Sequence, residues 1–165
     1  MQFRLLIAAF LSLLLAASLP ARADDAPPAA AVPAEPKPDL TRPDGVLKEL
    51  YTSYFATLNG GGKADVKDYA AKYFDPELAS KYAAATNGEG KIDFDIFINA
   101  QDHAELTLGT IKRTLESPTH AIYDVHFTNN DNERKVRVGL VKAGDTWKVT
   151  DIDYGQGLSL SGMLK

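Results

Sequence analysis

The runs KVRVGLVK at residues 135–142 and TWKVTDIDY at residues 146–154, joined by AGD at 143–145, decide the fold. Both runs are rich in β-branched and aromatic residues, and the short turn between them contains glycine, which is typical of a β-hairpin. Apolar side chains recur at every second position, as in a strand with one buried face. They are Val136, Val138 and Leu140 on the first run and Trp147 and Val149 on the second. The sequence therefore predicts a hairpin whose apolar side lies against a core.

The composition is that of an ordinary domain without disulfides. The chain has 165 residues and a formal net charge of −4, and it contains no cysteine. Disulfides, redox chemistry and thiolate metal sites are therefore excluded. The chain is acidic overall and has no basic cluster, which argues against nucleic acid or an anionic membrane surface as a partner.

Residues 1–23 predict a cleavable secretory signal peptide. Arg4 precedes an apolar run at 5–17, and ARA at 21–23 places small residues at the −3 and −1 positions of a cleavage site before Asp24. A membrane anchor is the less favoured alternative, because the apolar run is shorter than the roughly 20 residues that span a bilayer. We therefore expect a periplasmic or secreted protein that has no membrane span after cleavage.

Residues 24–43, which read DDAPPAAAVPAEPKPDLTRP, predict a disordered linker. Proline and alanine dominate this stretch, and it offers almost no large apolar side chain to bury. The alternative is a proline-rich ligand for a recognition domain. The folded domain is predicted to occupy residues 44–165.

Three helices are predicted at the start of this domain. Apolar residues follow a helical spacing from Asp44 to Leu58, and a second helical segment lies near 65–74. The third runs from Pro76 to about residue 85, because Asp75 is a good N-cap and proline suits the first turn. Residues 92–103 alternate large apolar with short polar side chains and are interpreted as an irregular, buried connector.

Four strands are predicted after the connector, in the order 105–115, 121–128, 135–142 and 146–154. Gly109 marks a possible bulge in the first. Sequential strands with short turns form an antiparallel sheet, and helices grouped before them make the fold α+β, with the helices packed on one face.

This order of elements, with FINAQD at 97–102 and WKVTDI at 147–152, resembles the bacterial proteins grouped as domain of unknown function 3828. They belong to the cone-shaped (cystatin-like) α+β superfamily named after nuclear transport factor 2. The resemblance covers residues 45 to the C-terminus and implies a strongly curved sheet wrapped around a helix, enclosing a conical cavity. Members of the superfamily include ketosteroid isomerases and dehydratases, together with ligand-binding, assembly and immunity domains, so that fold alone does not decide function. No motif here matches their catalytic sites.

Asn99, Gln101 and Asp102 are candidate ligand-binding residues. They follow a buried-looking apolar run at 96–98, and polar groups at such a position need hydrogen-bond partners. One hypothesis is that they form the rim of a pocket for a polar ligand, together with Asp151. The alternative is that they cap backbone groups where the connector enters the sheet.

Asp151 and Asp153 alternate with Ile152 and Tyr154, so the two carboxylates are predicted to share one face of the last strand. If that face lined a cavity, burial and mutual repulsion would raise the pKa of one carboxylate and create an acid or base. If it faces water, both are ordinary solvated charges.

No metal or cofactor is predicted. His103, His120 and His126 lack the spacing of a helical metal site. A complete phosphate-binding loop and a G-x-S-x-G nucleophile elbow are also missing from the sequence.

The leading hypothesis is an exported, non-catalytic binding or accessory domain that receives a small molecule or an envelope protein. The alternative is a small hydrolase or isomerase in which Asp102 or Asp151 is the base and Tyr54 or Tyr123 the hydrogen-bond donor. The protein is expected to be a monomer or a homodimer. The family resemblance suggests a dimer on the open sheet face, where 137, 139 and 141 lie.

Overall fold

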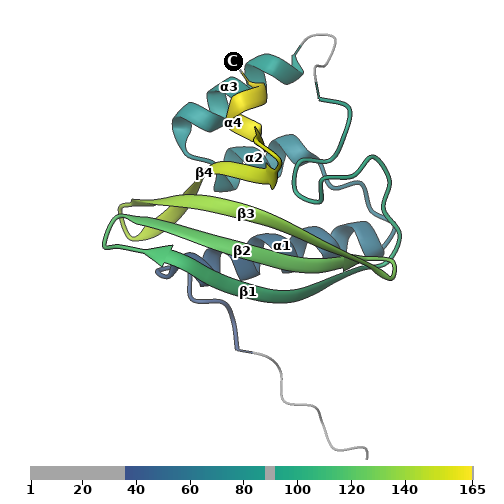
Figure 1. The fold of residues 1–165 in the computed structure, drawn as a ribbon, viewed down its shortest axis with the longest axis horizontal. Coiled ribbons are helices and arrows are strands. Elements are labelled where there is room, and N and C mark those ends of the chain that lie inside the picture. The colour runs from purple at the N-terminus through teal and green to yellow at the C-terminus, as the bar shows by residue number, and fades with distance from the viewer. Residues whose placement is uncertain (1–35, 88–91, 165) are drawn as a thin grey trace, which may run out of the picture. The chain divides into compact units, whose positions relative to one another are not determined.

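The computed structural model describes residues 36–87 and 92–164. The predicted signal peptide and most of the predicted linker lie outside these residues. Helices come first and strands follow, so the predicted α+β class is confirmed (Figure 1). The elements are α1 (Pro43–Asn59), α2 (Val66–Tyr73), α3 (Pro76–Thr86), β1 (Leu106–Glu116), β2 (His120–Asn129), β3 (Asn132–Ala143), β4 (Thr146–Gly155), β5 (Leu158–Ser159) and α4 (Leu160–Met163).

The helix starts follow from local chemistry. The Asp65 side chain accepts a hydrogen bond from the backbone N–H of Lys67 and begins α2. The Asp75 side chain accepts from the N–H of Leu78 at 2.7 Å and begins α3, so the predicted cap is confirmed. Helix α1 begins one residue earlier than predicted, at Pro43, because proline suits a first helical turn.

The strands form an antiparallel sheet in the order β1-β2-β3-β4-β5. The predicted hairpin is confirmed as β3 and β4, and its turn contains Gly144 with a φ of 62°. The sequence analysis missed β5 and α4, because each is only a few residues long and shows no periodicity. Strand β1 lies at an edge of the sheet. Two register shifts interrupt its pairing with β2, one at Gly109 as predicted and one at Thr114.

A third register shift in β4 changes which residues are buried. Gly139 pairs with Asp151 and Leu140 pairs with Val149, so Thr150 is an extra residue opposite β3. An extra residue reverses the faces of the positions that follow it. Ile152 is therefore buried on the same side as Val149, and Asp151 faces away from the core.

Helix α1 packs on one face of the sheet, and aromatic side chains fill the space between them (Figure 1). The ring of Phe127 on β2 lies 5.4 Å from that of Phe55 and 6.3 Å from that of Tyr51, measured between centroids. Tyr51 and Tyr54 are fully buried, so both belong to the core. The predicted irregular connector is buried only in part: the residues at 96–98 are at most 1% exposed, whereas Asp93 and 101–103 are exposed.

Two asparagine side chains hold backbone groups between the end of the connector and the start of β1. Asn59, the last residue of α1, donates to the carbonyl of Leu106 at 2.7 Å and accepts from its N–H at 2.9 Å. Asn129, which is 8% exposed, donates to the carbonyl of Asp102 and accepts from the N–H of Ala104. These side chains thereby provide hydrogen-bond partners for backbone N–H and carbonyl groups at a point where regular secondary structure begins or ends.

No helix within 36–87 and 92–164 combines the length and the apolar character needed to cross a membrane.

Candidate functional site

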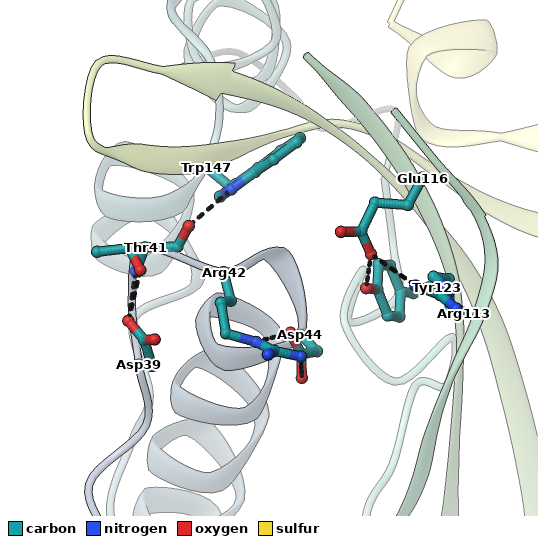
Figure 2. A network of polar contacts seen from close by, with 8 residues as sticks. All are labelled: Asp39, Thr41, Arg42, Asp44, Arg113, Glu116, Tyr123 and Trp147. Carbon is teal, nitrogen blue, oxygen red and sulfur yellow. Dashed lines mark hydrogen bonds and ion pairs between the residues drawn. The ribbon is translucent and has the colours of Figure 1, made fainter. Parts of the chain in front are cut away.

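A group of polar side chains lies where the start of α1 faces the end of β1 and the start of β2 (Figure 2). It consists of Arg42, Asp44, Arg113, Glu116 and Tyr123, and we call it the α1–β1 cluster. Its members come from segments about 70 residues apart in the sequence, so only the fold brings them together.

Tyr123 is the buried centre of the sheet side of the cluster. It is 3% exposed, and its hydroxyl donates to Glu116 Oε2 at 2.5 Å. Arg113 Nη1 lies 3.7 Å from the same carboxylate oxygen. Burial, followed by the hydrogen bond to Glu116, raises the pKa of Tyr123. The hydroxyl therefore stays protonated and acts as a donor.

Arg42 and Asp44 form the helix side of the cluster. The guanidinium of Arg42 donates two hydrogen bonds to the Asp44 carboxylate, at 3.1 and 3.2 Å. These bonds raise the pKa of Arg42. The charge of Asp44 also contributes to the raised pKa of Tyr123, so the two sides of the cluster influence each other electrostatically.

The backbone that leads into α1 is fastened to the hairpin (Figure 2). Trp147 Nε1 donates to the carbonyl of Thr41 at 3.1 Å, and the Thr146 hydroxyl donates to the carbonyl of Leu40 at 3.2 Å. Asp39 accepts from the N–H and the hydroxyl of Thr41 at 3.0 and 2.7 Å, which lowers the pKa of Asp39. Residues 39–42, the end of the predicted linker, are therefore ordered against the domain.

Gly45 makes this arrangement possible. A Cβ atom at this position would lie 1.9 Å from the backbone oxygen of Asp39. Any side chain larger than that of glycine would push the incoming segment away from α1. The position of Arg42 therefore depends on a glycine one turn into the helix.

The charged side chains of the cluster are exposed to solvent, while the hydrogen bonds described above hold the backbone of residues 39–42 in place. The side chains of Arg42 and Arg113 are 65% and 67% exposed, and those of Asp44 and Glu116 are 38% and 35% exposed. A guanidinium has five N–H donors, so each arginine keeps donors for another molecule. Such a surface suits recognition of polar groups on a partner.

The structure places the predicted connector residues at the surface. Gln101 and Asp102 are exposed, and Asn99 is half-buried with a φ of 50°, a conformation that asparagine tolerates. Gln101 Nε2 donates to the Asp93 carboxylate at 3.3 Å. Asp102 takes part in the fold through its backbone carbonyl, which accepts from Asn129.

Asp151 lies apart from these residues, beside α4. Its carboxylate accepts from the N–H and the hydroxyl of Ser161, both at 2.9 Å, and from the N–H of Ile152. These bonds hold the C-terminal turn on β4. Asp153 accepts from the N–H of Gly155 at 2.7 Å.

The hypothesised tyrosine donors have other partners than Asp102 or Asp151. Tyr123 donates to Glu116, as described above. Tyr54 donates to Asp95, a half-buried carboxylate on the connector that also accepts from the N–H of Phe97 at 2.9 Å. Burial raises the pKa of Asp95, and these hydrogen bonds partly offset the effect.

Asp95 is also near further tyrosines from α1, α3 and β4. Burial first, and then the charge of Asp95, raise the pKa of Tyr82 to about 12. The pKa of Tyr51 is raised in the same way. Burial is also the main cause of the raised pKa of Tyr154, whose hydroxyl donates to the carbonyl of Ile96. The sequence analysis missed Asp95, although its place between two large apolar residues was a signal that the side chain is partly buried.

Two surface hollows in the described part of the chain are small. One of 260 Å³ lies between α3 and β4, near Lys81 and Thr150, and one of 120 Å³ lies beside Arg137 and Tyr154. Pockets for small molecules measure about 300–1,000 Å³. Within the same residues, no three His, Asp or Glu side chains are grouped so that they could hold a metal ion.

None of the protein-family models or curated proteins compared with this sequence matches it. A chain of the crystal structure of the type VI native effector–immunity complex Tae3–Tai3 from Ralstonia pickettii is similar in structure, with a TM-score of 0.53. The likeness is one of fold. The two chains are 18% identical, and the alignment covers 72% of this chain and 98% of that chain.

Proposed function

We propose that this protein is an exported, non-catalytic accessory domain that binds a protein partner at the α1–β1 cluster. The proposal rests on the two exposed guanidinium groups of Arg42 and Arg113, held beside a buried tyrosine on a fixed base. Arginine is enriched among the residues that dominate binding at protein interfaces. A fixed base also reduces the entropy lost when a partner binds.

Two further points support a protein partner. The structural neighbour comes from a complex of two proteins, an effector and an immunity protein. The sequence resembles domain of unknown function 3828 and the nuclear transport factor 2-like superfamily, in which assembly and immunity domains occur. The predicted signal peptide at residues 1–23 supports export to the periplasm or beyond.

Photo-crosslinking tests this proposal. A photoreactive amino acid at Thr114, next to Arg113, should capture a specific protein from an envelope extract, and the same group at Lys63 should not. Arg113→Ala should weaken binding of the captured protein about ten-fold, as expected for a central interface arginine. Arg134→Ala, an exposed arginine on β3, serves as the matched control. If Arg113→Ala and Arg42→Ala both bind as tightly as the unmodified protein, the cluster is not the binding site.

A small hydrolase or isomerase is the second candidate function, and the contact between Tyr54 and Asp95 favours it. A partly buried carboxylate with a raised pKa is a potential base, and a tyrosine hydroxyl is a potential donor. In this version Asp95 takes the role hypothesised for Asp102 or Asp151. Turnover of a small ester or ketone by the unmodified protein that disappears in Asp95→Asn would support it. Equal turnover by both would exclude it.

A further inference from the structure

The α1–β1 cluster exposes its guanidinium groups more than its carboxylates. The side chains of Arg42 and Arg113 are 65% and 67% exposed, against 38% for Asp44 and 35% for Glu116. The carboxylates are also engaged within the chain. Glu116 accepts from the Tyr123 hydroxyl at 2.5 Å, and Asp44 accepts two hydrogen bonds from Arg42. Another molecule therefore meets mainly the donors of the cluster.

The two guanidinium groups keep most of these donors. A guanidinium has five N–H groups. Arg42 uses one at Nε and one at Nη2 to bind Asp44, which leaves three. Within the described residues Arg113 makes an ion pair with Glu116 at 3.7 Å, which is too long for a hydrogen bond. Its N–H groups are therefore still available to bind acceptors on another molecule.

A third cation, Lys142 on β3, lies at the same end of the domain. Its side chain is exposed, and its ammonium group lies 5.8 Å from the ring centroid of Trp147. Trp147 in turn donates to the carbonyl of Thr41, next to Arg42. The backbone N–H of Lys142 donates to the carbonyl of Thr119 at 2.9 Å and so joins β3 to the turn between β1 and β2. Three segments thus hold cationic side chains on a connected framework.

The formal charges of the cluster favour recognition at short range. Those of Arg42 and Arg113 cancel those of Asp44 and Glu116, so long-range attraction contributes little. Hydrogen bonds from a guanidinium to a carboxylate are strong and directional, because the planar fork matches the two oxygens. A phosphate also fits this fork, but the net charge of −4 disfavours nucleic acids and anionic membranes as partners. Carboxylates on a protein are the acceptors that remain.

We propose that the partner presents an acidic segment whose carboxylates bind the guanidinium groups of Arg42 and Arg113, which rests on the proposed function and gives the chemistry of its partner. Asp44 and Glu116 repel any carboxylate that approaches them directly. The segment therefore carries separate acidic side chains, one for each arginine. Lys142 lies beyond Trp147 and binds a further acidic group at the border of the contact.

A peptide titration followed by two-dimensional amide NMR tests this recognition on the purified protein. Blocked tetraglutamate should shift the resonances of 42–44 and 113–116, with a Kd on the order of 1 mM. Blocked tetraglutamine, which has the same length and no charge, should leave them in place. Inorganic phosphate at the same concentration should shift them less. The resonances around Arg134, an exposed arginine on β3, serve as the internal control.

Arginine-to-lysine variants separate the guanidinium fork from its charge. Arg42→Lys and Arg113→Lys keep a positive charge but lose the planar set of donors. Each should weaken binding of tetraglutamate about five-fold, and Arg134→Lys should leave it unchanged. The amide spectrum of each free variant shows whether its fold is retained.

Absence of a specific shift with tetraglutamate, or equal shifts with tetraglutamine, would overturn the proposal. Unchanged affinity in both lysine variants, or larger shifts with phosphate at the same residues, would overturn it as well. Failure of the proposed function has a different result, because crosslinking would then capture no protein that depends on Arg113. A captured partner that does depend on Arg113, together with no response to tetraglutamate, would remove the acidic segment and leave the proposed function standing.

Discussion

Asp95 offers the sharpest test of how the connector is held. Replacing it with alanine removes the acceptor for the Tyr54 hydroxyl and for the N–H of Phe97. Tyr54 is fully buried, so its hydroxyl would be left without a partner. A buried polar group left unpaired costs about 1–3 kcal/mol. Because the N–H of Phe97 loses its acceptor as well, we expect Asp95→Ala to lower the free energy of unfolding by about 2–3 kcal/mol.

Asp95→Asn is the matched control. Its amide oxygen can still accept from the N–H of Phe97, and its amide nitrogen can donate to the oxygen of Tyr54. We expect its free energy of unfolding at pH 7 to lie within about 1 kcal/mol of the unmodified protein. For a domain of this size, 1 kcal/mol corresponds to about 4 °C in melting temperature. The alanine variant should therefore melt about 10 °C lower, and the asparagine variant close to the original.

The pH dependence supplies a second measurement. Burial raises the pKa of Asp95 above its ordinary value of 3.8, so between the two values the folded protein binds more protons than the unfolded chain. The stability contributed by protonated Asp95 is complete below pH 3.8 and is lost as pH rises through the folded-state pKa. The unmodified protein should therefore lose stability relative to Asp95→Asn across that interval, as urea unfolding at several pH values would show. Parallel curves, or an alanine variant as stable as the asparagine variant, would refute this account.

Three further substitutions test contacts elsewhere in the domain. Asn129→Ala should lower the free energy of unfolding by about 2 kcal/mol, because it leaves two backbone groups of the connector unpaired, as urea unfolding would measure. Tyr51→Phe should leave stability unchanged or raise it by about 1 kcal/mol, since this buried hydroxyl has no hydrogen-bond partner among the residues that the structure describes; a clear loss would reveal a missed one. Gly45→Ala should destabilise by about 1–3 kcal/mol through contact with the backbone oxygen of Asp39, and should alter the fluorescence of Trp147, the single tryptophan.

Local signals in the sequence predicted most elements of the fold. Alternation from Val136 to Val149 predicted the hairpin, and Asp75 followed by proline predicted the start of α3. The extra residue at Thr150 could not be predicted from alternation, because a bulge depends on the pairing of two strands. The bulge nevertheless leaves a sign in the sequence, because the large apolar residues Val149 and Ile152 are three positions apart, which breaks the alternation by two.

The candidate site was less accessible to sequence reasoning. Tyr123 was singled out as a donor, but its partner Glu116 was not, because the hairpin register between β1 and β2 decides which side chains meet. Asn59 and Asn129 each bind backbone groups more than 20 residues away. Such contacts leave no periodic pattern in the sequence. The ligand-binding roles of Asn99, Gln101, Asp102 and Asp151 stay predictions.

The two bulges of β1 have a consequence for the behaviour of the protein at high concentration. An unpaired edge strand is a template on which strands of other molecules can add, one after another. In β1 the register shifts divide the paired residues into runs of three, three and two. A foreign strand would find no regular row of donors and acceptors long enough to pair with. The interrupted pairing therefore hinders growth of the sheet into fibres through this edge.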